Sequence, residues 1–560
     1  MTSQPNGTNG DHAKATPEHY DAIVIGGGGF SGLRALYEVR RQGLNAKAFE
    51  AGSGIGGTWY WNRYPGARTD SESWTFIFSF LREYGLDDWA WKERYPQQDE
   101  VEVYLNRLAD HLELRQMIQF STLVTAARRD EKRNVWKVKT SDGGEYTCKF
   151  LITGSGPLAT PVDPPFPGLK SFKGEWYQTG LWPKEKVDFA GKRVAVVGAG
   201  ATAVQVIPIV AHSAKHLTVF QRTPNYVIPS RNHPLTPEQY GEIKRDYKDI
   251  KQRALGQTWG FDMFDSKDMY TIIKEDPEEV QRVLDRGWEK GGFRYFFETF
   301  ADLLMDEDCN KQVSDFVRRK IRTVVRDKET AEVLCPKYPV VTKRPPLGHH
   351  YYETFNKPNV SLVDCMKVPI EDVTPAGIKT ADNEYDFDMI IFALGFDAVL
   401  GTLDKIDIRN ENNERLGDNL KANLEVNLGS TVPGFANMFM IFGPTAAFAN
   451  SPLIIDITSD FAGQTIAWMK ENNVDRCEST KEGAEKWSQH VRDLYDMLII
   501  SKQKDNVRSW LMGNNIPGKK VTPVFFYGGV PAYYAALTKE REDGYPGHMF
   551  SKTDGPALTA

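Results

Sequence analysis

The chain has 560 residues, 41% of them hydrophobic, which is enough for roughly three or four domain-sized units with buried cores. Its net charge of −6 argues against a nucleic-acid partner, and no apolar run approaches the ~18 residues that a membrane span requires. Residues 1–19 are polar and have no signal-peptide core, so we expect a disordered tail on a cytoplasmic protein.

The first structured segment predicted along the chain is a strand–turn–helix unit. An apolar strand over 20–25 leads into Gly27, Gly29 and Gly32 in G-x-G-x-x-G spacing, and the next strand ends at Glu50. In dinucleotide-binding units of this kind, pyrophosphate binds at the helix N-terminus, and the residue that ends the second strand reads the ribose. The Glu50 carboxylate can accept hydrogen bonds from a bare ribose, as FAD requires.

A second unit of the same kind begins with an apolar strand over 194–197. Gly198, Gly200 and Ala203 follow it, and the next strand ends at Arg222. A guanidinium at this position suits the 2′-phosphate of NADPH. One such motif alone could be a tight strand–helix turn without a ligand, but two in the required context favour a protein that binds FAD and NADPH.

The positions of the cysteines and histidines limit the classes of enzyme that the chain could belong to. The five cysteines are scattered, none forms a C-x-x-C pair, and none precedes Cys148. Disulfide reductases, which also combine FAD and NADPH, need a cysteine pair beside the flavin, so this class is excluded. His349 and His350 have no further metal ligands nearby in the sequence, and we interpret them as loop residues without a metal.

The order of predicted elements indicates an α/β fold with two Rossmann-like dinucleotide-binding domains, both discontinuous, and an inserted helical lobe. The expected parts are a tail (1–19), FAD-binding domain (20–156), NADPH-binding domain (157–230), helical insertion (231–330), the rest of the NADPH-binding domain (331–384), the rest of the FAD-binding domain (385–546) and a tail (547–560). A strand over 385–394 is expected to close the FAD-domain sheet. We interpret the lobe as scaffolding and expect the reactive site in the cleft between the domains.

An aromatic segment follows the first unit. Trp59, Tyr60 and Trp61 offer flat surfaces for a flavin ring, although packing in an aromatic core would explain these residues equally well. The surrounding GGTWYWNRYPGARTD (56–70) resembles the flavin-domain motif of type I Baeyer–Villiger monooxygenases.

The resemblance covers about residues 20–546 and includes several further motifs, VFQRTP (219–224), TKRPPLGHHYYETFNKPNV (342–360), ALGFDA (393–398) and SWLMGNNIPGK (509–519). The family's identifying pattern, F-x-G-x-x-x-H-x-x-x-W-P, is matched by Phe172, Gly174, Trp182 and Pro183, with Gln178 in place of histidine. We expect this difference to affect coupling or domain motion more than the type of reaction, because the motif is expected to lie in an interdomain linker.

The resemblance implies a reaction and two catalytic residues. NADPH would reduce FAD, and the reduced flavin would react with molecular oxygen to give an anionic C4a-peroxide. This peroxide would insert oxygen next to the carbonyl of a small ketone and give an ester or lactone. Arg344 would be the fixed cation beside the peroxide, and Asp70 would position it. From the sequence alone, a solvated loop arginine is the favoured interpretation of Arg344, and Asp70 could be a helix or turn cap.

The expected cofactor contacts combine the two glycine motifs with positions matched to the family. The 2′-phosphate would be held by Arg222, Thr223 and Lys343, and Trp510 would lie over the nicotinamide ribose and the substrate pocket. The complete set is Gly27, Gly29, Phe30, Ser31, Gly32, Glu50, Thr58, Trp59, Tyr60, Trp61, Arg68, Thr69, Asp70, Val124, Gly198, Gly200, Ala201, Thr202, Ala203, Gln205, Arg222, Thr223, Lys343, Arg344 and Trp510.

Two other functions fit the same nucleotide motifs. A flavin monooxygenase that oxidises nitrogen or sulfur shares both domains, but a nucleophilic substrate requires a protonated peroxide. The Arg344–Asp70 combination favours the anion and therefore a ketone. A non-catalytic sensor would bind both nucleotides without steady oxidation of NADPH.

Overall fold

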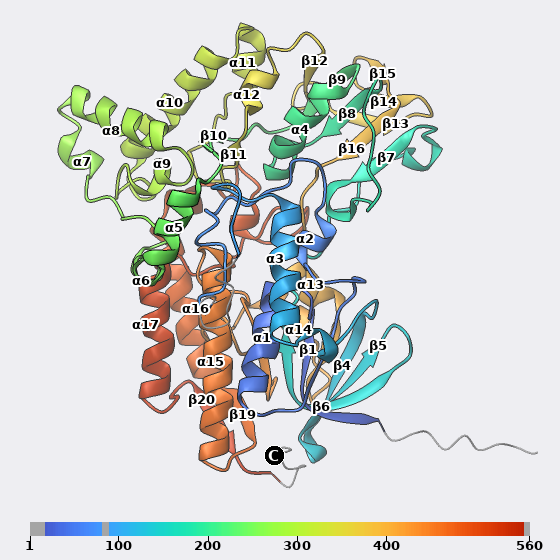
Figure 1. Ribbon diagram of the computed structural model, residues 1–560, viewed down its shortest axis with the longest axis vertical. Helices are drawn as coiled ribbons and strands as arrows, with labels where there is room; N and C mark the ends of the chain where they lie inside the picture. The colour runs from blue at the N-terminus through green and yellow to red at the C-terminus, as the bar shows by residue number, and fades with distance from the viewer. Residues whose placement is uncertain (1–16, 81–88, 554–560) are drawn as a thin grey trace, which may run out of the picture.

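The structure is a computed structural model that describes residues 17–80 and 89–553, so most of the expected N-terminal tail and half of the expected C-terminal tail lie outside the described residues. Two mostly parallel sheets lie one above the other, with a helical lobe beside the upper one (Figure 1). The first sheet has the strand order β17-β4-β5-β6-β1-β2-β3, and β18 also pairs with β6. Its strands are β1 (Glu18–Ile25), β2 (Ala46–Phe49), β3 (Ile118–Gln119), β4 (Val124–Asp130), β5 (Val135–Thr140), β6 (Glu145–Thr153), β17 (Asp407–Arg409) and β18 (Met438–Met440).

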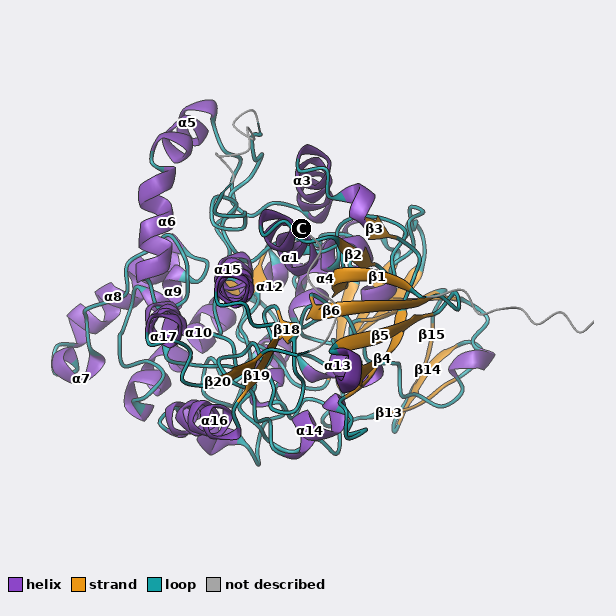
Figure 2. Ribbon diagram, turned by 90° about the horizontal axis from the view of Figure 1, so that it is seen from below, coloured by secondary structure: helices purple, strands orange, loops and turns teal. Residues whose placement is uncertain are grey.

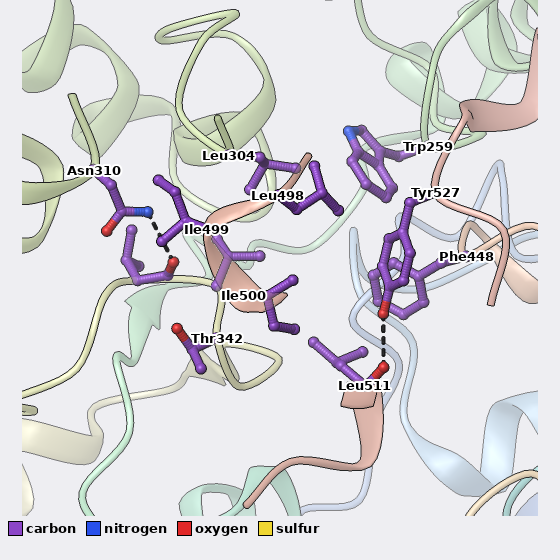
Figure 3. A pocket seen from close by; sticks show the side chains of 12 residues that line it. Trp259, Leu304, Asn310, Thr342, Phe448, Leu498, Ile499, Ile500, Leu511 and Tyr527 are labelled. Atoms are coloured by element: carbon purple, nitrogen blue, oxygen red, sulfur yellow. Dashed lines mark hydrogen bonds between the residues drawn. The ribbon is translucent and has the colours of Figure 1, made fainter. Parts of the chain in front are cut away.

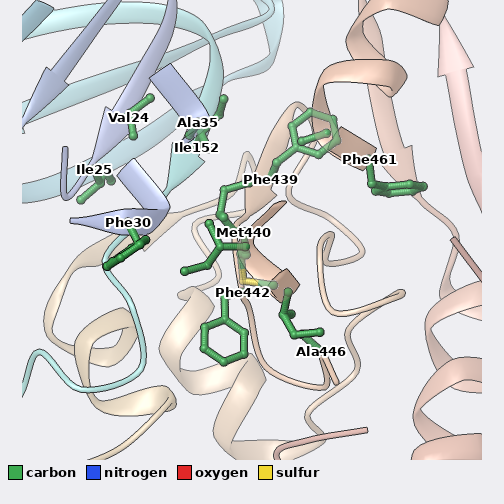
Figure 4. Packing of buried hydrophobic residues seen from close by; sticks show 14 of the residues in the cluster. Val24, Ile25, Phe30, Ala35, Ile152, Phe439, Met440, Phe442, Ala446 and Phe461 are labelled. Atoms are coloured by element: carbon green, nitrogen blue, oxygen red, sulfur yellow. The ribbon is translucent and has the colours of Figure 1, made fainter. Parts of the chain in front are cut away.

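The core of the first unit is built from segments that are far apart in the sequence. Central strand β1 is buried on both faces, as expected for a parallel strand covered by helices. The helices of this unit include α1 (Phe30–Arg41), α3 (Gln98–His111) and α15 (Ser451–Glu471), and α1 packs against α15. Figure 4 shows Val24 and Ile152 of the sheet near Phe439 and Met440 of β18. The C-terminal segment therefore completes this unit.

The second sheet is entirely parallel and has the order β12-β9-β8-β16-β7. Its strands are β7 (Glu175–Gln178), β8 (Arg193–Val197), β9 (His216–Gln221), β12 (Val360–Asp364) and β16 (Met389–Phe392). Helices α4 (Ala201–Ser213) and α12 (Tyr351–Thr354), the pair β10 (Ile228–Pro229) and β11 (Leu347–Gly348), and the small sheet β13 (Ile370–Val373), β14 (Gly377–Thr380) and β15 (Glu384–Asp386) accompany it.

One strand assignment from the sequence is wrong. We expected 385–394 to close the FAD-domain sheet, but β16 lies between β8 and β7 in the second sheet, and β15 belongs to the small antiparallel sheet. An apolar strand that is buried on both faces fits the centre of either parallel sheet, so the sequence pattern could not choose between them.

The helical lobe interrupts the second sheet between β9 and β12 and lies at the upper left of Figure 1. It contains α5 (Pro237–Arg245), α6 (Tyr247–Gly256), α7 (Tyr270–Ile273), α8 (Pro277–Lys290), α9 (Arg294–Phe297), α10 (Glu307–Val324) and α11 (Lys328–Leu334). Helix α11 extends past the expected limit at residue 330.

The C-terminal part adds helices and one further strand pair. The helices are α13 (Leu400–Lys405), α14 (Leu416–Ala422), α16 (Lys481–Asp496) and α17 (Gly529–Glu542). Strand β20 (His548–Ser551) pairs with β19 (Arg476–Ser479), so part of the segment expected as a tail (547–560) belongs to the fold. Figure 2 shows β1, β6, β5 and β4 side by side in the first sheet. No helix within the described residues is both long and apolar enough to cross a bilayer.

Two crossings, the segments 154–174 and 393–406, connect the sheets and are hydrogen-bonded to each other. The chain leaves the first sheet after β6 and returns after β16. The Val162 amide donates to the Gly395 carbonyl (3.0 Å), and Asp397 donates to Thr160 (2.8 Å). The Gln178 side chain, at the end of edge strand β7, donates through Nε2 to the Val162 carbonyl at 2.8 Å. Gln178 thus ties the second sheet to the paired crossings.

Candidate active site

A cavity of about 1170 Å³ lies among the carboxyl ends of strands from both sheets and is also lined by the helical lobe. Ligands of open α/β sheets bind at such strand ends. All the predicted site residues line the cavity except four, namely Gly27, Gly32, Tyr60 and Ala203. The predicted nucleotide motifs and the predicted catalytic pair therefore share one space.

The first glycine motif shapes the wall of this cavity. Gly29 caps α1, and a Cβ on Gly57 would lie 2.5 Å from the Gly29 Cα, so these backbones are in close contact. A Cβ on Gly32 would lie 2.1 Å from the Gly26 carbonyl oxygen, so α1 can approach β1 only because Gly32 has no side chain. The start of α1 is open to the cavity and offers backbone N–H groups to an anion.

Glu50 lies directly after β2 and lines the cavity. Its carboxylate accepts hydrogen bonds from the amides of Gly28 (2.9 Å) and Gly52 (2.8 Å). Burial raises its pKa, while the two amide bonds act in the opposite direction. The side chain is thus held in the position that the motif predicts for a ribose acceptor.

The aromatic segment forms the short helix α2 (Thr58–Trp61). Trp59 and Trp61 line the cavity, whereas Tyr60 does not. The Tyr60 hydroxyl is hydrogen-bonded to the Ser53 hydroxyl at 2.7 Å, and Lys184 Nζ lies 5.0 Å from the centre of its ring. Tyr60 therefore packs behind the residues that line the cavity and does not contact the cavity itself.

Arg344 and Asp70 form an ion pair, although 274 residues separate them in the sequence. The Asp70 side chain is 8% exposed, and its second oxygen, Oδ1, is buried without a hydrogen-bond partner among the described residues. The Arg344 guanidinium carbon also lies 5.1 Å from the centre of the Phe293 ring. An unused acceptor in a cavity wall is an atom that a ligand can satisfy.

The second motif faces the same cavity from the other sheet. Gly198 has a positive φ of 137°, and a Cβ there would lie 2.4 Å from the Ala393 carbonyl. Gln205 of α4 accepts a hydrogen bond from Tyr64 at 2.7 Å and donates to the Arg68 carbonyl at 3.0 Å, which fastens the second unit to the first.

Three cations gather where the 2′-phosphate is expected. Arg222 and Lys343 line the cavity together with Arg508, which the sequence reasoning missed. Lys343 Nζ donates to the Arg508 carbonyl at 2.7 Å. Burial, followed by the charge of Arg222, lowers the pKa of Lys343 to about 8. Cations that repel one another at a cavity wall favour an anionic ligand.

Aromatic side chains missing from the predicted set line the cavity on the side of Arg344. They are Trp259, Phe261, Phe293, Phe296, Phe297, Phe448 and Phe525. Trp510 joins them, with its ring centroid 6.0 Å from that of Phe448. The lobe supplies most of these rings, so its interpretation as plain scaffolding is wrong. The aromatic stretch FRYFFETF (293–300) was the available sequence signal.

A second cavity of about 30 Å³ lies beside the first and shares with it Trp259, Val341, Phe448 and Leu511 (Figure 3). Polar groups in its wall are paired. Asn310 donates to the Val340 carbonyl at 3.1 Å, and Tyr527 donates to the Leu511 carbonyl at 2.8 Å. The small cavity therefore lies behind the segment that carries Lys343 and Arg344.

No cluster of three or more metal-ligating side chains occurs within the described part of the chain. His349 is bonded through Nδ1 to the Ser230 hydroxyl at 3.0 Å, and burial lowers its pKa to about 3. It is therefore neutral at physiological pH, and the imidazole has a structural partner.

Comparison with known proteins identifies the family. Residues 21–253 match the flavin-binding monooxygenase-like family. A Baeyer–Villiger monooxygenase from Pseudooceanicola batsensis is 39% identical over 97% of this chain and 98% of its own. A phenazine N-monooxygenase from Lysobacter antibioticus is 37% identical over 95% and 97%. The crystal structure of cyclohexanone monooxygenase from Rhodococcus sp. Phi1 bound to NADP+ is 38% identical, with a TM-score of 0.92 over 96% of this chain and 100% of that one.

The chain belongs to the Baeyer–Villiger monooxygenase family. The closed crystal structure of cyclohexanone monooxygenase matches it equally well, with a TM-score of 0.92 and 37% identity. This agreement confirms the expected α/β fold with two dinucleotide-binding domains.

Proposed function

We propose that this protein is an FAD-containing, NADPH-dependent Baeyer–Villiger monooxygenase, which uses molecular oxygen to convert a small ketone into an ester or lactone in the cytoplasm. The observation that carries this proposal is the Arg344–Asp70 pair in the wall of the cavity between two dinucleotide motifs. A permanent cation beside an apolar, aromatic-walled space suits a reaction in which negative charge develops on oxygen.

The residues present fit both cofactors. For FAD, Gly29 and Gly57 are in contact where side chains would clash, the Glu50 carboxylate would accept hydrogen bonds from the ribose, and Asp70 Oδ1 would accept one from the cofactor. For NADPH, Arg222 and Lys343, which both line the cavity, would bind the 2′-phosphate. When bound, the flavin supplies the hydride acceptor and the centre that activates oxygen.

The chain's own residues would create the conditions for oxygen insertion. Arg344 would present a planar guanidinium with several N–H donors to the cavity. Asp70 fixes the direction of the guanidinium, which leaves other N–H groups free to donate to a ketone oxygen. Aromatic side chains such as Trp510 and Phe448 exclude water, which strengthens these electrostatic interactions.

The test is a panel of ketones with analysis of both NADPH consumption and products. We expect ester or lactone to form with at least one ketone. Arg344→Ala should still oxidise NADPH but lose ester formation by roughly 10²–10³-fold, the usual cost of removing one preorganised charge-stabilising group. Arg245→Ala, which changes an exposed arginine on α5, is the control and should behave as wild type. Normal ester yield from Arg344→Ala would remove this residue from the chemistry.

A second candidate function is oxygenation of nitrogen in an aromatic heterocycle. The phenazine N-monooxygenase is nearly as similar as the first-named relative, and the aromatic walls of the cavity would accept a flat ring system. The same assay with amines, sulfides and N-heterocycles separates the candidates. N-oxide formation without any ester would favour the second. An absence of NADPH oxidation with every substrate would indicate a nucleotide-binding protein without this activity.

A further inference from the structure

We propose that Phe293 and Arg294 of the helical lobe are positioning residues that hold the Arg344–Asp70 pair for ketone oxygenation. The inference rests on the proposed function and adds the lobe to the machinery of the site. The two residues are consecutive in the chain, and each contacts a different partner. Phe293 lies against the guanidinium of Arg344, and Arg294 binds Glu72, two residues after Asp70.

The first contact is a cation–π interaction. The Phe293 ring is 8% exposed, and its centroid lies 5.1 Å from the Arg344 guanidinium carbon. The Arg344 side chain is 28% exposed, and the ion pair with Asp70 covers only part of its guanidinium. An aromatic face at this distance attracts the cation and limits its rotation away from Asp70.

The second contact fixes the segment that carries Asp70. Glu72 is 3% exposed and accepts hydrogen bonds from Arg94 Nη2 (2.7 Å) and from Arg294 Nε (3.3 Å). Arg294 also donates to Glu298 (2.5 Å) and to the Asp262 carbonyl (2.6 Å), so its guanidinium is held within the lobe. Arg94 and Glu72 belong to the first unit, whereas Arg294 belongs to the lobe. The buried carboxylate of Glu72 therefore links the first unit to the lobe.

A turn of two glycines directly before Phe293 positions Phe293 and Arg294. Gly291 and Gly292 end α8 with φ values of +62° and +60°, which side chains rarely adopt. A Cβ on Gly292 would lie 2.1 Å from the Tyr95 hydroxyl, and its amide donates to the Pro229 carbonyl at 2.9 Å. The turn thus packs directly on the first unit and leads straight into the positioning residues.

The lobe also holds Arg344 from the other direction along the chain. The Val340 amide donates to the Ser314 hydroxyl (3.0 Å), and its carbonyl accepts from Asn310 (3.1 Å), both on α10. The dashed line at Asn310 in Figure 3 marks the second of these bonds. Val341 then adopts a φ of +69°, a strained value for a β-branched residue that only firm neighbours maintain. Helix α10 of the lobe therefore holds the segment that carries Arg344.

The experiment compares Phe293→Leu, Phe293→Tyr and Phe293→Trp in the full-length holoenzyme. We expect Phe293→Leu to lower the rate of ester formation about tenfold, while NADPH-driven flavin reduction stays within about twofold of wild type. Tyrosine and tryptophan keep a π-face and should restore the rate to within about threefold. Phe316→Leu removes a buried aromatic side chain of the lobe outside the cavity wall. It should lower the thermal unfolding midpoint without changing ester formed per NADPH consumed.

Arg294→Met and Arg294→Lys test the second contact. Methionine should lower ester formed per NADPH several-fold, and lysine should recover at least half of the loss, whereas Arg286→Met, an exposed lobe variant, should have no effect. Crystal structures of Phe293→Leu and Arg294→Met should show the Arg344 guanidinium displaced from Asp70. An undisturbed ion pair in both structures, or equal losses in all three Phe293 variants, would overturn the inference. If wild type forms no ester with any ketone, the proposed function fails, and the crystal structures still decide the positioning role.

Discussion

Lys343 is the residue whose protonation links pH to cofactor choice. Its pKa is lowered to about 8, so the ammonium is mostly charged at pH 7 and mostly neutral at pH 9. A bound 2′-phosphate favours the charged form and raises this pKa, so binding takes up a proton above pH 8. We expect the affinity for NADPH to fall about tenfold between pH 7 and pH 9, because only about a tenth of Lys343 remains charged at pH 9.

Isothermal titration with NADPH and NADH across this pH range measures the effect. NADH, which has no 2′-phosphate, is the matched ligand control and should show no decline of this origin. Lys343→Met should weaken NADPH binding and abolish the pH dependence. The same decline with both nucleotides would assign it to another group.

Helices α1 and α4 begin at equivalent places in the two motifs, and the third glycine position of the motif is Gly32 in α1 and Ala203 in α4. Gly32 in α1 has no space for a methyl group, because the nearest atoms are the backbone oxygen of Gly26 and the Cα of Gly27. We expect Gly32→Ala to push α1 away from β1 at a cost of about 1–3 kcal/mol, which lowers FAD affinity roughly 5- to 150-fold. Flavin absorbance after gel filtration and a titration with free FAD provide the measurement.

The matched control is the equivalent residue of α4, Ala203, which is fully buried. Ala203→Gly removes a methyl group and should cost about 1 kcal/mol of helix stability without loss of FAD. Equal flavin loss in both variants would show a general loss of stability rather than a specific close contact in the first motif.

Local elements of this fold could be predicted from sequence, while their assignment to sheets could not. The strand–glycine–helix patterns around Gly29 and Gly200 appear where expected, because local hydrophobic periodicity and turn residues determine them. The place of β16 depends on which sheet its backbone pairs with, and β20 is a short strand after a turn-rich stretch. Aromatic residues of the lobe reach the cavity only through tertiary packing, so family motifs gave Arg344 and Asp70 but not Phe293.

At the scale of the whole molecule, both units are discontinuous, and two paired crossings join them. Gln178 has a more specific place than the sequence indicated. It ends an edge strand of the second sheet rather than lying within a free linker, and its amide holds the carbonyl of Val162 on the first crossing. Other groups reach the second crossing, since Asn515 donates to the Phe396 carbonyl at 2.7 Å and Lys519 pairs with Asp397. Relative placement of the two nucleotide sites therefore depends on a small set of polar contacts.

Gln178 offers a direct test of that dependence. Gln178→Ala leaves the half-buried Val162 carbonyl without this donor, at a cost of about 1 kcal/mol, and should lower the ester formed per NADPH consumed. Gln178→His keeps a donor and should preserve activity, but it introduces a group that titrates near neutral pH, so its coupling should vary between pH 6 and 8 where wild type does not. Gln178→Leu separates packing from hydrogen bonding, because it fills a similar volume without a donor. If alanine and leucine both match wild type in rate and in product ratio, the bond to Val162 has no part in keeping the two sites in register. If leucine alone matches wild type, side-chain volume rather than the hydrogen bond fixes the crossing.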